Sequence, residues 1–142
     1  MSAGQHTAPL GLLLSDDMIF TSRITGTARD LGLGIKAATS IRELIAHATQ
    51  QAPTCVIVDL ANPSLGIREL IEQLRAACTQ MPRVVAYGSH VDTAGLEEAR
   101  DAGCDVVLPR SKFVQELPRA MLDWMRSQPQ TSSPGSKGLA RS

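Results

Sequence analysis

The sequence predicts an α/β protein built on a doubly wound, five-stranded parallel sheet with strand order 2-1-3-4-5. Short apolar runs alternate with longer segments of helical period, and this alternation occurs five times along the 142 residues. Such a rhythm is typical of a parallel sheet with helices packed on both faces. One run, CVIVD at 55–59, is apolar until its final carboxylate, as expected for a central strand that is buried on both faces.

The predicted strands are apolar runs bounded by turn residues. The second is short, the third is rich in β-branched residues, and the fourth follows Pro82. We therefore expect the third strand at the centre of the sheet and the second at an edge. The five strands are predicted at 10–15, 34–38, 55–59, 83–88 and 104–109.

A helix is predicted after each strand, because apolar side chains recur there at helical spacing. Ser40 and Glu43 have the spacing of a capping box, and Gly32 and Gly103 are stop signals. Pro118 is placed early in the last helix, where a kink or a late start is tolerated. The helices are predicted at 18–32, 39–51, 67–78, 93–103 and 112–127. The core-facing residues of the first and last helices are predicted to be Ile19, Phe20, Ile24, Ala28 and Leu31, and Phe113, Leu117, Met121, Leu122 and Met125, with Trp124 also in the core.

Composition and chain organisation narrow the class of protein. Residues 9–127 form one predicted domain, preceded by a flexible start at 1–8 and followed by a Ser, Pro and Gly-rich tail at 128–142 that is predicted to be disordered. The 14 basic and 14 acidic residues give zero formal charge, which argues against nucleic acid or an anionic membrane as a partner. No apolar run approaches the roughly 18 residues of a membrane span. Three widely spaced cysteines indicate reduced thiols, so we expect a cytoplasmic protein.

Acidic residues follow two strands that should be neighbours. In a doubly wound sheet, ligands bind beyond the carboxyl ends of the strands where the strand order reverses. There, Asp16 and Asp17 after the first strand should meet Asp59 at the end of the third. Three close carboxylates favour a hard cation such as Mg²⁺, and a backbone carbonyl such as that of Ala61 could complete its ligands. A metal-bound Asp59 could then attack a phosphoryl group.

Over residues 9–126 the chain resembles the receiver domains of two-component response regulators, which have a flavodoxin-like (βα)5 fold. The resemblance rests on the five-fold rhythm, on Asp16 and Asp17, on Asp59 with Pro63 close behind, and on the segment GCDVVLPRS. It implies that Asp59 is a phosphoacceptor and that Asp16 and Asp17 hold magnesium. It further implies a histidine kinase or phosphotransfer protein as the phosphodonor. The downstream protein partner is not indicated, and a second copy of the chain is one option.

Three positions depart from the receiver pattern. Receivers carry a hydroxyl residue at the end of the fourth strand, where this chain has Gly88, with Ser89 next to it as a weaker candidate. They carry a lysine after the fifth strand, where this chain has Arg110. Arginine keeps the charge but is not equivalent to lysine, so Arg110 either contacts phosphate or pairs with Asp59. Val107 stands at the aromatic switch position.

These departures leave alternatives open. The main hypothesis is a divergent receiver that binds magnesium, accepts phosphate and signals by binding another protein. The second is a pseudo-receiver, an interaction or dimerisation module that works without phosphorylation. A flavin binder or phosphohydrolase ranks last, because SDDMIFTSR offers an acidic turn rather than a phosphate-binding loop. The protein is therefore not expected to be an enzyme.

Overall fold

The computed structural model describes residues 9–62 and 65–126, so the predictions for 1–8 and 128–142 lie outside the described residues. The five strands form one parallel sheet in the order β2-β1-β3-β4-β5, which confirms the predicted fold class. The elements are β1 (Leu10–Leu14), α1 (Met18–Asp30), β2 (Gly34–Ala38), α2 (Ile41–Gln50), β3 (Cys55–Asp59), α3 (Ile67–Ala77), β4 (Arg83–Gly88), α4 (Thr93–Ala102), β5 (Val106–Pro109) and α5 (Arg110–Met125).

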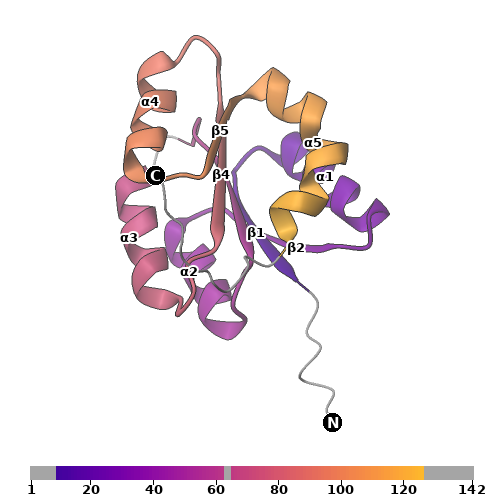
Figure 1. Ribbon diagram of the computed structural model, residues 1–142, viewed down its shortest axis with the longest axis vertical. Helices are drawn as coiled ribbons and strands as arrows, with labels where there is room; N and C mark the ends of the chain where they lie inside the picture. Colours follow the sequence, from indigo (N-terminus) through magenta and orange to yellow (C-terminus); the bar gives the residue numbers. More distant parts are fainter. Residues whose placement is uncertain (1–8, 63–64, 127–142) are drawn as a thin grey trace, which may run out of the picture.

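The sheet separates two layers of helices (Figure 1). Helices α2, α3 and α4 cover one face, and α1 and α5 cover the other. The central strand β3 feeds both cores, because Val56 and Val58 pack on the first face while Cys55 and Ile57 pack on the second. All residues of β3 are buried, including its last, Asp59. Burial on both faces is the reason that this strand shows no polar alternation.

Local signals placed most helix ends correctly. The Ser40 hydroxyl accepts a hydrogen bond from the Glu43 amide at 3.1 Å, as a capping box requires. The Glu43 carboxylate reaches back to the amide of Thr39 (3.0 Å) rather than to that of Ser40. Gly103 ends α4 with φ of 109°, a conformation that favours glycine.

Helix α5 differs from its prediction. It begins at Arg110, two residues earlier than expected, directly after Pro109 at the end of β5. Pro118 lies in the interior of this helix, with an exposed side chain, rather than near its start. The early start is important for the site because it makes Arg110 the first helical residue beyond the sheet edge.

Two predicted core residues are exposed. Ile19 is 81% exposed, because its neighbour Phe20 is the residue of that turn that contacts the core ring of Tyr87. Leu122 on α5 is 47% exposed. The prediction for Trp124 is confirmed, since it is buried with its ring centroid 5.5 Å from that of Phe113. Within the described residues, no helix is both long and apolar enough to cross a bilayer.

Candidate functional site

Asp59 is a buried carboxylate at the carboxyl end of the central strand, with only 2% of the residue exposed. The Ser15 hydroxyl donates a hydrogen bond to its Oδ2 at 3.1 Å. The Ala61 amide donates to its Oδ1 at 2.9 Å, and Nη2 of Arg110 lies 3.9 Å from the same oxygen. Both oxygens are therefore satisfied by groups of the chain itself, which offsets the cost of burying the charge.

Arg110 neutralises Asp59 without being locked in place. The 3.9 Å separation is at the long end for an ion pair, and 39% of the arginine side chain is exposed. Its guanidinium also lies over the ring of Phe20, 5.6 Å from the centroid. Such a contact favours the cation modestly at a partly exposed position. Arg110 thus connects the buried carboxylate to the surface between α1 and α5.

The predicted cluster of three carboxylates is not assembled. Asp17 is the N-cap of α1 and accepts a hydrogen bond from the Phe20 amide at 3.0 Å. Asp16 is exposed and makes no hydrogen bond or ion pair with a described residue. Across 9–62 and 65–126, no group of three or more His, Cys, Asp or Glu side chains could hold a metal ion. The physical reason is register, since β1 ends at Leu14 and Ser15 takes the place beside Asp59.

The capping role of Asp17 can be tested by substitution. Asp17→Ala should lower the free energy of unfolding by about 1 kcal/mol, because the Phe20 amide loses its acceptor. Asp17→Asn should leave it nearly unchanged, because asparagine caps equally well. Urea denaturation measures both changes. If asparagine is as damaging as alanine, the charge of Asp17 is important for a reason other than capping.

Tyr87 is the residue of β4 beside Asp59, and it was not among the site residues predicted from the sequence. The register pairs Tyr87 with Asp59 and pairs Gly88 with Pro109, so Gly88 is not the neighbour of the carboxylate. The Tyr87 ring is fully buried between Phe113 and Phe20, with centroid separations of 4.4 and 5.0 Å. A signal was present, because this is the only tyrosine of the chain and it ends an apolar run.

The Tyr87 hydroxyl is buried without a hydrogen-bond partner among the described residues. The Asp59 carboxylate and the Ser15 hydroxyl are near enough to influence its ionisation but not in bonding geometry. Burial first, and then the Asp59 charge, raise the pKa of Tyr87 above its ordinary value. The hydroxyl next to Asp59 is therefore a neutral phenol held in an apolar setting.

The other predicted positions have local roles. Ser89 accepts a hydrogen bond from the Val91 amide at 3.3 Å within its own loop. Gly88 leaves room for Leu60, since a Cβ added at position 88 would lie only 3.2 Å from Cβ of Leu60. Val107 pairs with Ala86 and packs on the face covered by α2, α3 and α4. The aromatic cluster near Asp59 lies on the opposite face.

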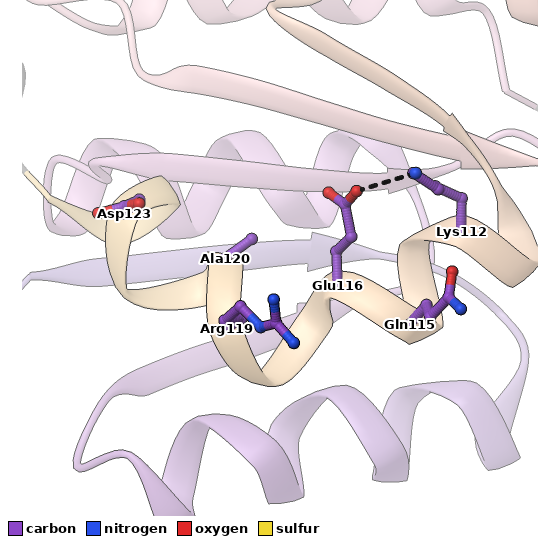
Figure 2. A pocket seen from close by; sticks show the side chains of 6 residues that line it. All are labelled: Lys112, Gln115, Glu116, Arg119, Ala120 and Asp123. Atoms are coloured by element: carbon purple, nitrogen blue, oxygen red, sulfur yellow. Dashed lines mark ion pairs between the residues drawn. The ribbon is translucent and has the colours of Figure 1, made fainter.

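Two surface hollows lie near the start of α5. One adjoins the Asp59 site, because Phe20 and Arg110 line it. The other follows the outer side of α5 and contains none of the residues around Asp59 (Figure 2). Its charges are partly paired within the helix, because Nζ of Lys112 lies 3.5 Å from Oε2 of Glu116. The candidate site is therefore the edge of the sheet around Asp59. The hollow of Figure 2 is lined by Lys112, Gln115, Glu116, Arg119, Ala120 and Asp123.

Comparison with solved structures identifies the fold. A scan of family models and a search of curated proteins found no match. A response regulator receiver domain from Bermanella marisrubri is similar with a TM-score of 0.72 and 20% identity, over 84% of this chain and 100% of the other.

Two further structures carry functional information about themselves. A receiver domain of a Pseudomonas aeruginosa sensor histidine kinase, with magnesium coordinated in its active site cleft, gives a TM-score of 0.70 at 19% identity over 84% and 98% of the chains. The receiver domain of Saccharomyces cerevisiae Ssk1 was crystallised with the histidine phosphotransfer protein Ypd1. It is similar with a TM-score of 0.62 and 17% identity, over 80% of this chain and 91% of the other. The chain therefore has the fold of a response regulator receiver domain.

Proposed function

We propose that the protein is a receiver-fold signalling module that acts through protein–protein contacts and does not require phosphorylation. The observation that carries this proposal is the internal network around Asp59. Ser15 and Ala61 donate hydrogen bonds to the carboxylate, and Arg110 forms a long ion pair with it. A carboxylate neutralised in this way can stabilise the edge of the sheet without a metal or a phosphoryl group.

A strong magnesium site fits this donor set poorly. Magnesium prefers several oxygen ligands in near-octahedral geometry. Asp17 caps a helix, and a serine stands beside Asp59. Both oxygens of Asp59 already accept hydrogen bonds, and the Arg110 guanidinium beside Oδ1 opposes a second cation there. We therefore assign no step in the function of this protein to a bound metal.

Exposed apolar side chains near the site support a protein partner. Met18 and Ile19 in the first turn of α1 are exposed, and so is Val91 in the loop after β4. All three follow the carboxyl ends of strands and thus lie toward the same edge as Asp59. Apolar residues gathered at one place on a surface are typical of interaction sites. The partner is a signalling protein or a second copy of this chain.

A phosphoaccepting receiver is the second candidate function. The half-exposed Arg110 beside Asp59 favours it, since a guanidinium there could move onto a phosphoryl group. An Asp59 oxygen would attack the phosphorus of a phosphohistidine on a histidine kinase or phosphotransfer protein. The phosphorus–nitrogen bond would break and leave neutral histidine after protonation. Magnesium would be needed, and the bonds from Ser15 and Ala61 would have to open or be shared.

One experiment separates the two candidates. Thermal unfolding of the parent and of Asp59→Asn is measured with and without millimolar magnesium and beryllofluoride. We expect both proteins to respond equally and weakly, because the carboxylate is already satisfied. A phosphoacceptor would instead be stabilised by about 2.7 kcal/mol at 100 times the dissociation constant, and Asp59→Asn would lose this gain.

A further inference from the structure

A hollow of about 590 Å³ opens beside Asp59, between the start of α1, the loop after β4 and the start of α5. Its volume is within the range of small-molecule sites. The wall is largely apolar and includes Phe20 and Val114. The ring of Phe20 also contacts Tyr87 and Phe113, so this part of the wall is held by the core.

Two guanidinium groups and an imidazole lie in the hollow. Arg23, His90 and Arg110 line it from three elements, and no lining residue is acidic. Neither the Arg23 guanidinium nor the His90 imidazole makes a hydrogen bond or ion pair with a described residue. Arg110 faces Asp59 at 3.9 Å and keeps other guanidinium donors for a ligand.

The start of α5 adds to the positive electrostatic potential in the hollow. The helix has no side-chain cap and no acidic residue in its first turn. Its first amides therefore carry the positive end of the helix dipole, and Ser111 in that turn lines the hollow. Two guanidinium groups, free helix amides and a hydroxyl match the oxygens of an anion.

We propose that this hollow binds a small organic anion. A phosphate or carboxylate head lies between Arg23 and Arg110, and an aromatic or branched apolar body packs on Phe20 and Val114. Phosphorylation of Asp59 is not needed for this binding. A ligand here would cover the exposed start of α1 and would alter the surface that we propose for a protein partner.

The test uses the full chain in magnesium-free buffer with phenyl phosphate and benzoate as probes. Amide NMR shifts and titration calorimetry report binding. We expect saturable shifts at Arg23, Ser111 and Val114 with one or both probes. The responding probe identifies the head group. Inorganic phosphate has only the anionic head and phenol only the aromatic body. Each should bind at least roughly tenfold more weakly than the complete probe.

Matched variants locate the site. Arg23→Gln should weaken binding roughly tenfold, the loss of one charge-assisted contact. Arg29→Gln, on the exposed surface of the same helix but outside the hollow, should not change it. Asp59→Asn removes the carboxylate that competes for Arg110, so it should not weaken binding, which separates this site from phosphoacceptor chemistry. Equal effects of the two arginine variants, loss of binding in Asp59→Asn, or no saturable binding of either probe would overturn the proposal.

Discussion

Tyr87→Ala is expected to lower the free energy of unfolding by about 3 to 5 kcal/mol, and Tyr87→Phe is expected to raise it by about 1 kcal/mol. The first change removes a fully buried ring that stacks on Phe113 and contacts Phe20, and leaves a cavity. The second removes only a hydroxyl that is buried without a partner. The two effects have opposite signs because the buried ring stabilises the fold, whereas the unpaired hydroxyl destabilises it.

Urea denaturation at neutral pH measures both changes. Val91→Ala, at an exposed apolar residue, is the control and should alter stability by less than about 0.5 kcal/mol. A loss of stability in Tyr87→Phe would contradict the reading of the hydroxyl as unpaired. It would mean that the phenol donates to Asp59 or Ser15 in solution and belongs to the carboxylate network.

Stability is expected to fall steeply above pH 9 because of Cys55. Burial raises the pKa of this thiol from 9.0 to about 12, and the nearby Arg83 and Asp105 charges modify it less. Above pH 9 the unfolded chain releases the proton while the folded chain keeps it, so each pH unit up to the folded pKa costs about 1.4 kcal/mol. At about pH 10.5 the loss from Cys55 alone is roughly 2 kcal/mol.

Below pH 9 this contribution is complete and constant, because the thiol is neutral in both states. Cys104, whose pKa burial raises to about 11, and Tyr87 act in the same direction. The measurement compares urea denaturation near pH 8 and pH 10.5 in the parent and in Cys55→Ala. We expect the variant to lose less stability on the alkaline side, by roughly 2 kcal/mol. Identical pH dependence in both proteins would show that Cys55 is not the titrating group.

Local pattern was sufficient for the architecture. The apolar runs, the helical spacing, the Ser40 cap and the Gly103 stop are set by neighbours in sequence, so they predicted the elements, whereas the strand order was taken from the order common to doubly wound sheets. The same pattern placed Asp59 at the end of a buried strand, and Arg110 was predicted to lie near it. The elements depend on interactions between residues that are close in the chain, whereas the position of Arg110 came from the resemblance to receivers.

The side chains that meet at the site depend on how the strands pair. Hydropathy does not determine the last residue of a strand, and a shift of one residue turns a side chain to the opposite face. Ser15 therefore lies beside Asp59 where an aspartate was predicted, and Tyr87 is the β4 neighbour where Gly88 was considered. Likewise, Ile19 has the helical spacing of a core residue, but the adjacent Phe20 is the residue of that turn that contacts the core. The apolar pattern of the chain is therefore sufficient to predict the sheet and its central carboxylate, whereas pairing register across β1, β3 and β4 sets the partners of that carboxylate.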